Sequence, residues 1–139
     1  MRRLGRLGPA LLALCLLGCG PAVAGHEETC RVDGAQGVCE GAYSSIRGLH
    51  LHEVAAPSIA AGQPVEVEVQ IAVDGGALRA SVTSPAGEES ACVARPDSPE
   101  SLMAVATMGE GEVLPITLEA VERRRAVGVT YMIAWAAAP

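Results

Sequence analysis

The chain has 139 residues, of which 10 are basic and 16 acidic, so its formal net charge is −6 at pH 7. Its length fits one domain of ordinary size, and its negative charge makes nucleic acid and anionic lipid headgroups poor partners because like charges repel. With one Trp and two Tyr, it also lacks the aromatic platforms on which bases and sugars stack.

The N-terminal segment up to residue 24 has the composition of an export signal. Arg2, Arg3 and Arg6 form a basic start, and an apolar stretch follows over residues 7–17. This stretch is too short to cross a bilayer core, which needs ~20 apolar residues. We therefore interpret it as a signal segment rather than a transmembrane anchor.

Two processing sites compete within this leader. Leu16-Leu17-Gly18-Cys19 resembles the lipobox of bacterial lipoproteins. The resemblance implies a signal peptide over residues 1–18, acylation of Cys19 and attachment of the mature chain to a membrane through lipid. Gly20, by the same resemblance, points to the outer membrane of the cell envelope. Alternatively, Ala22-Val23-Ala24 fits the small-x-small rule of ordinary signal peptidase, and cleavage after Ala24 would release a secreted protein.

Residues 19–43 are expected to form an N-terminal tether with a cysteine loop. Cys30 and Cys39 flank a segment that contains the turn dipeptide Asp33-Gly34, so their flanks can approach as a hairpin. In an exported protein this predicts a Cys30–Cys39 disulfide, with pairing of either cysteine to Cys92 as the alternative. The spacing of the two cysteines is too long for a zinc knuckle.

Residues 44–139 alternate between apolar and polar side chains, which predicts β-strands. The run over 65–73 carries Val or Ile at every second position, and Asp74-Gly75-Gly76 separates it from a second run over 78–82, which predicts a hairpin. Pro115 pushes the strand expected over 112–121 toward a sheet edge, because proline has no N–H for the ladder. Further strands are expected over 46–54, around 92–93, over 102–108 and over 127–135.

Six or seven short strands with turns between them predict an all-β fold, a small immunoglobulin-like β-sandwich over residues 44–139. The segment from Pro57 to Val65 resembles the opening of many bacterial immunoglobulin-like domains, in which Pro, a short gap and Gly precede the first long core strand. The Cys-Trp-Cys core of antibody domains is missing from this sequence. A β-barrel is the alternative architecture.

His50 and His52 form the one suggestive cluster of possible ligands. In a strand they point to the same face about 6.6 Å apart, as metal-binding His-x-His pairs do. Glu53 or His26 would be the source of a third ligand. The alternative is that the pair forms only a polar face of its strand.

No motif for catalysis or cofactor binding occurs in the sequence. Gly-x-Ser-x-Gly, a phosphate-binding loop and a dinucleotide fingerprint are all missing, so we expect no enzymatic activity and no cofactor. The basic run Arg123–Arg125 is either a solvated turn or a docking point for an acidic partner.

The leader and the sandwich together predict a membrane-anchored lipoprotein. We expect it to act as a non-enzymatic binding or structural component of a cell-envelope assembly, with an envelope protein as its partner. A periplasmic metal-binding lipoprotein that uses His50 and His52 is the alternative.

Overall fold

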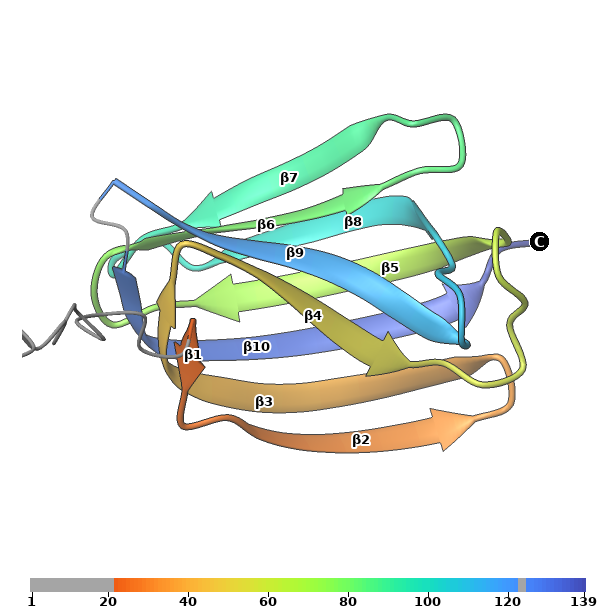
Figure 1. Ribbon diagram of the computed structural model, residues 1–139, viewed down its shortest axis with the longest axis horizontal. Helices are drawn as coiled ribbons and strands as arrows, with labels where there is room; N and C mark the ends of the chain where they lie inside the picture. Colours follow the sequence, from red (N-terminus) through yellow and green to blue (C-terminus); the bar gives the residue numbers. More distant parts are fainter. Residues whose placement is uncertain (1–21, 123–124) are drawn as a thin grey trace, which may run out of the picture.

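The computed structural model describes residues 22–122 and 125–139, which form ten strands in two antiparallel sheets (Figure 1). This arrangement confirms the predicted all-β sandwich, with more strands than the six or seven expected. Cys19 and the rest of the lipobox lie outside the described residues, as do Arg123 and Arg124. Across the described ranges, no helix is long and apolar enough to cross a membrane.

The first sheet has the order β1-β3-β10-β5-β8, and β2 pairs with β3 beside β1, on the side away from β10. The second sheet has the order β4-β9-β6-β7. The strands of the first sheet are β1 (Val23–Ala24), β2 (Glu27–Asp33), β3 (Gln36–Arg47), β5 (Pro64–Ala72), β8 (Glu100–Thr107) and β10 (Arg125–Ala137). Those of the second are β4 (Leu49–Ala55), β6 (Ala77–Thr83), β7 (Glu89–Ala94) and β9 (Val113–Val121).

The apolar residues of the alternating runs form the core between the sheets. Val65, Val67, Val69 and Ile71 of β5 are buried, while Glu66 and Gln70 point away from the core. Leu78, Ala80 and Val82 of β6 are buried in the same core and reach it from the second sheet. These observations confirm which faces of β5 and β6 are apolar.

The hairpin predicted between these two runs is wrong. β5 pairs with β10 and β8, whereas β6 pairs with β9 and β7, so the two strands lie in different sheets. The segment Asp74-Gly75-Gly76 carries the chain from one sheet to the other, and Asp74 and Gly75 donate backbone hydrogen bonds to Val127. Two apolar faces that meet across a core have the same sequence pattern as two that share one sheet.

The strand expected over 46–54 is in fact two strands. β3 ends at Arg47 and β4 begins at Leu49, and Gly48 between them has a φ of 58°. Glycine adopts this left-handed backbone at little cost, so the chain turns there and passes to the second sheet. Ile46 and Arg47 therefore belong to the first sheet, whereas the rest of the expected strand, from Leu49 on, belongs to the second.

The expected tether over residues 19–43 is part of the sandwich wherever it is described. β1, β2 and most of β3 fall within this range and belong to the first sheet, and Cys39 and Tyr43 are buried in the core. The domain boundary placed at residue 44 thus falls inside β3. The predicted Cys30–Cys39 disulfide is present and joins β2 to β3 across directly paired positions. Cys92 is free.

The edge position predicted for the strand with Pro115 is wrong, because β9 lies between β4 and β6. Proline still lacks the N–H that a strand paired on both sides would need, and the pairing of β9 accommodates this. β6 pairs with β9 only over Thr117–Val121, whereas Pro115 has Glu53 of β4 as its partner on the other side. Pro115 therefore occupies the part of β9 that has a neighbouring strand on one side only, where a missing N–H leaves no gap in the ladder.

Candidate metal centre

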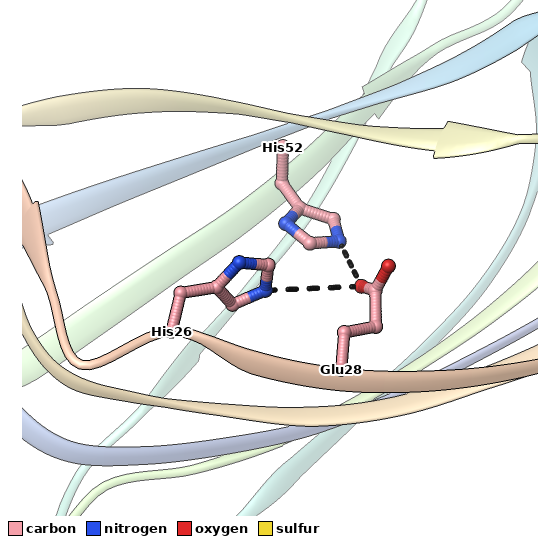
Figure 2. Close-up of side chains that lie close together, drawn as sticks. All are labelled: His26, Glu28 and His52. Atoms are coloured by element: carbon pink, nitrogen blue, oxygen red, sulfur yellow. Dashed lines mark ion pairs between the residues drawn. The ribbon is translucent and has the colours of Figure 1, made fainter.

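All three histidines and both tyrosines of the chain meet at one open side of the sandwich. The site lies between β2, at the edge of the first sheet, and β4, at the edge of the second. Figure 2 shows His52 pointing from β4 toward His26, which directly precedes β2, and toward Glu28, which lies in β2. Residues far apart in the sequence thus face one another across the gap between two sheet edges.

The alternation of β4 turns His52 toward the core. His52 is 3 % exposed and is followed on the same face by the buried Val54, whereas Glu53 lies on the outer face. His50 shares the inner face, near the start of β4, and is half-buried. The side-chain period of two that predicted a common face for the two histidines is therefore confirmed.

Gly41 of β3 makes room for the tyrosine that holds Glu28. Tyr131 of β10 is paired with Gly41, and Gly41 is paired with Glu28 of β2, so the three lie in one row across the sheet. A Cβ atom on residue 41 would lie 2.3 Å from the Tyr131 hydroxyl oxygen. Because glycine has no such atom, the tyrosine ring crosses β3 and its hydroxyl donates to Glu28 Oε2 at 2.5 Å.

Glu28 is the centre of the cluster. Its Oε2 lies 2.8 Å from His52 Nε2 and 4.0 Å from His26 Nε2. His26 is held in turn by a 2.8 Å hydrogen bond between its Nε2 and the Tyr131 hydroxyl, and by stacking on the Tyr43 ring at a centroid distance of 4.3 Å. The carboxylate thus has an imidazole on either side of it and a phenol that fixes its orientation.

His52 Nε2 is buried without a hydrogen-bond partner among the described residues. Its distance to Glu28 is that of a hydrogen bond, but the carboxylate oxygen lies off the direction in which an Nε2 proton would point. The other ring nitrogen, Nδ1, is 2.5 Å from the Tyr43 hydroxyl, which also lies 3.1 Å from His50 Nε2. If Tyr43 donates to His50 and accepts from His52, Nε2 of His52 presents a lone pair beside a carboxylate, an arrangement that a cation would stabilise.

The environment favours the neutral forms of His52 and His50. Burial lowers the pKa of His52, and the Glu28 charge offsets only part of this effect. Burial and the nearby His26 also lower the pKa of His50. A histidine with a lowered pKa is neutral at pH 7 and keeps a lone pair for a metal ion.

The two tyrosines remain neutral hydrogen-bond donors. Burial, the hydrogen bond to Glu28 and the Glu28 charge raise the pKa of Tyr131 far above its ordinary value. Burial and the Glu28 charge raise the pKa of Tyr43 to about 12. Both phenols therefore orient ligands through hydrogen bonds, a role that partners of metal-binding side chains commonly have.

The geometry of His26, Glu28 and His52 fits a small divalent metal ion. One ligand atom from each side chain lies within 4.8 Å of the others. Two ligands bound at about 2.1 Å in tetrahedral geometry are about 3.4 Å apart, a separation that falls between the 2.8 Å and 4.0 Å distances from Glu28. Two imidazoles and one carboxylate suit Zn²⁺ or Cu²⁺ and leave a further coordination position open.

The sequence-predicted ligand pair is only partly brought together. His52 lies in the cluster, but the Nε2 atom of His50 is directed to the Tyr43 hydroxyl, and the His50 and His52 ring centroids are 6.4 Å apart. His26, which we considered as a third ligand, does join the cluster. Glu53, the other residue considered, lies on the opposite face of β4.

Glu28 was missed because residues 19–43 were interpreted as a tether. A signal was nevertheless present: His26, Glu28 and Cys30 follow one another at every second position before a hairpin turn. In a strand this spacing places all three on one face.

No protein-family model matches the chain. A comparison with curated proteins likewise finds no match. The functional conclusion therefore rests on the chemistry of the cluster itself.

Proposed function

We propose that this domain binds one divalent transition-metal ion, such as Zn²⁺ or Cu²⁺, through His26, Glu28 and His52. The observation that carries the proposal is the buried Nε2 atom of His52, which faces the Glu28 carboxylate at 2.8 Å and has no partner with hydrogen-bond geometry among the described residues. An unpaired buried polar atom costs about 1–3 kcal/mol. Coordination of a metal ion by Nε2 and the carboxylate would remove this cost and neutralise the Glu28 charge.

We further propose that the metal site belongs to an exported protein that is anchored through lipid at Cys19. The lipobox resemblance supports the anchor, and the Cys30–Cys39 disulfide supports export, because disulfides persist in oxidising compartments. Mass spectrometry of the mature N-terminus tests the anchor. An acylated N-terminal Cys19 is expected, whereas an unmodified chain that starts at Gly25 would contradict lipidation.

A non-enzymatic role in an envelope assembly is the second candidate function. Leu49 and Leu51 on the outer face of the edge strand β4 are 64 % and 48 % exposed, which favours contact with another protein. Crosslinking in the native membrane should recover the same neighbouring envelope protein repeatedly, and recovery should fall with Leu51→Asp. Recovery of this chain alone would contradict this second function.

Titration of the metal-free protein with Zn²⁺, followed by calorimetry, tests the metal site. We expect one ion to bind per chain, and we expect Glu28→Gln and His26→Ala each to weaken binding by about 10–100-fold. Both residues lie near the surface, so their substitution should leave the fold intact, as circular dichroism can verify. Glu53→Gln, on the opposite face of β4, is the matched control and should leave a Zn²⁺ affinity close to that of the wild type.

The proposal would be contradicted by wild-type protein that binds no Zn²⁺ or Cu²⁺. It would also be contradicted if His50→Ala weakened binding as much as His26→Ala. That second result would instead support the ligand pair of His50 and His52 predicted from the sequence.

A further inference from the structure

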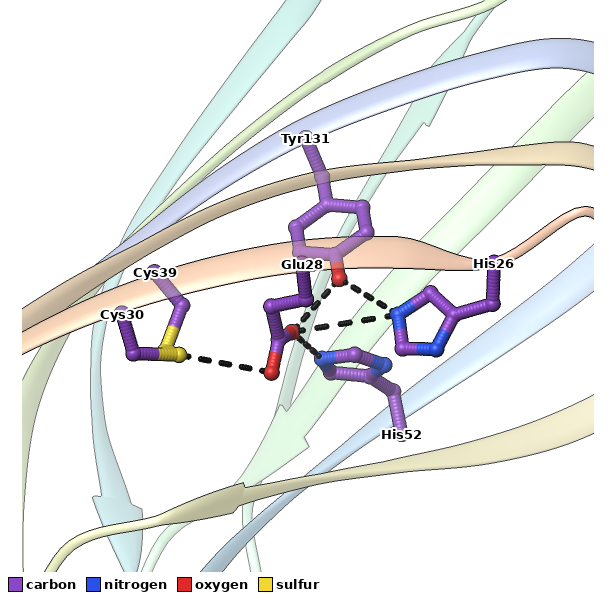
Figure 3. Close-up of a disulfide and its surroundings, with 6 residues drawn as sticks. All are labelled: His26, Glu28, Cys30, Cys39, His52 and Tyr131. Carbon is purple, nitrogen blue, oxygen red and sulfur yellow. Dashed lines mark hydrogen bonds and ion pairs between the residues drawn. A yellow bond between two sulfur atoms is a disulfide. The ribbon is translucent and has the colours of Figure 1, made fainter.

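The disulfide lies directly beside the metal site, on the same face of the sheet. Glu28 and Cys30 are two residues apart on β2, and their partners Gly41 and Cys39 are neighbours on the same face of β3. Figure 3 shows the Glu28 carboxylate between the disulfide and the two histidines. Its Oε1 lies 3.3 Å from Cys30 Sγ, while its Oε2 faces His52.

We propose that reduction of the Cys30–Cys39 disulfide creates a second metal site, formed by Cys30, Cys39 and Glu28, that takes a soft ion such as Cu⁺. The inference rests on the proposed metal-binding function, because Glu28 belongs to both sites. The oxidised protein then has an imidazole–carboxylate site for Zn²⁺ or Cu²⁺. The reduced protein has thiolate sulfurs at the same place, so the redox state of the disulfide selects the metal.

The two sulfurs remain close together after reduction because other interactions hold β2 in place. β2 pairs with β3 at every residue from Glu27 to Asp33, and Gly34 with a φ of 60° forms the turn between them. Tyr131 also holds Glu28 through its hydroxyl. A sulfur of each cysteine and a carboxylate oxygen of Glu28 lie within 4.8 Å of one another, so small side-chain shifts suffice to surround an ion.

The exposure of the two cysteines sets the course of the reduction. Cys30 is exposed and Cys39 is fully buried, so an external dithiol attacks Cys30 Sγ. The Cys30–Cys39 bond breaks, and Cys39 leaves with the electron pair as a thiolate. The second sulfur of the dithiol then attacks the mixed disulfide and releases Cys30. The dithiol supplies two electrons and two protons and leaves as its own disulfide.

The ligand chemistry of the two forms explains the expected selectivity. Thiolate sulfur is a soft ligand that favours Cu⁺, whereas imidazole and carboxylate favour borderline and hard divalent ions. Metal binding to the reduced form displaces the thiol protons.

The test is an anaerobic titration of the full-length chain with Cu⁺ in competition with a coloured Cu⁺ chelator. Reduced wild-type protein is expected to bind one Cu⁺ per chain roughly 100-fold or more tightly than the oxidised protein. The Cys30→Ser/Cys39→Ser variant should lose this gain under the same reducing conditions. Every other cysteine is shared by the two proteins, so the difference between them reports the proposed site alone.

Equal Cu⁺ affinity of the oxidised and reduced wild type would overturn the inference, as would undiminished affinity of the double serine variant. Loss of the sheet signal in circular dichroism on reduction would also overturn it, because the site needs the β2–β3 ladder. His26→Ala separates the two proposals: it should weaken Zn²⁺ binding to the oxidised protein and leave Cu⁺ binding to the reduced protein unchanged. Zn²⁺ binding without a Cu⁺ gain would contradict the thiolate site alone, and a Cu⁺ gain without Zn²⁺ binding would contradict the oxidised site alone.

Discussion

Tyr131→Phe is the substitution that most directly probes how the cluster is held together. It removes the hydroxyl group of Tyr131. This hydroxyl donates to Glu28 Oε2 at 2.5 Å, and its oxygen lies 2.8 Å from His26 Nε2. The ring itself is 5 % exposed, and its packing over Gly41 is retained. The variant therefore isolates the hydrogen bonds of the hydroxyl from the hydrophobic contacts of the ring.

The expected loss follows from the charge and the exposure of the acceptor. A hydrogen bond to a charged group contributes about 1.5–3 kcal/mol. Because 20 % of the Glu28 side chain is exposed, water can replace part of the lost bond, and we expect a loss in the lower part of this range, about 1.5–2 kcal/mol. Zn²⁺ affinity should fall about 10–100-fold, since the carboxylate loses the group that orients it.

Urea denaturation of the metal-free protein measures the first effect, and Zn²⁺ titration measures the second. The control is a double-mutant cycle with Glu28→Gln, which makes the acceptor neutral while keeping its shape. Tyr131→Phe should cost clearly less stability in that background than in the wild type. If the two substitutions are additive within about 0.3–0.5 kcal/mol, the hydroxyl does not act through Glu28 and the reasoning is refuted.

Three further outcomes are expected. Burial lowers the pKa of His52 below 6.5 despite the opposing Glu28 charge, and the nearby His26 and His50 lower it further. The phenols of Tyr43 and Tyr131, which face His52, stay neutral. As the pH falls, His52 binds a proton in the unfolded chain before it does so in the folded protein. The free energy of unfolding should therefore fall as the pH is lowered from about 7.5 to about 5.5. Thermal denaturation should show this slope and its flattening in His52→Gln; a slope unchanged in that variant would assign it to other groups. Replacing Cys30 and Cys39 by Ser should lower stability by about 2–3 kcal/mol, because the closed loop is short, while circular dichroism retains the sheet signal; an unfolded variant would contradict the role given to the β2–β3 ladder. Ile116→Ala in the core should cost about 2–5 kcal/mol in urea denaturation, whereas Leu51→Ala on the outer face of β4 should stay within about 0.5 kcal/mol; equal losses would contradict the burial of the one and the exposure of the other.

The cluster illustrates how a site can be assembled from strand edges. β2 and β4 are the edge strands on one side of the sandwich, and each contributes polar side chains to the gap between the sheets. An edge gives such side chains access to solvent and ions while one end of the site stays buried, as the 3 % exposure of His52 shows. The glycine at position 41 then allows a residue two strands away to support the carboxylate.

The alternation of apolar and polar residues by itself determined the class of the fold and the orientation of most side chains. The buried face of β5, the common face of His50 and His52 and the pairing of Cys30 with Cys39 all follow from a period of two or from a short turn. These are local properties, because a strand presents successive side chains to opposite faces whatever its neighbours are.

Only the tertiary structure decided which strands are neighbours, and through them the composition of the site. The same alternation fits a hairpin or a crossing between sheets, which is why the hairpin predicted over 65–82 was wrong. Glu28 meets His52 because β2 and β4 lie at facing edges of two sheets, and it is oriented by Tyr131 because Gly41 opens a path across β3. Such contacts depend on the packing of both sheets around one core, and no segment of the sequence contains that information alone.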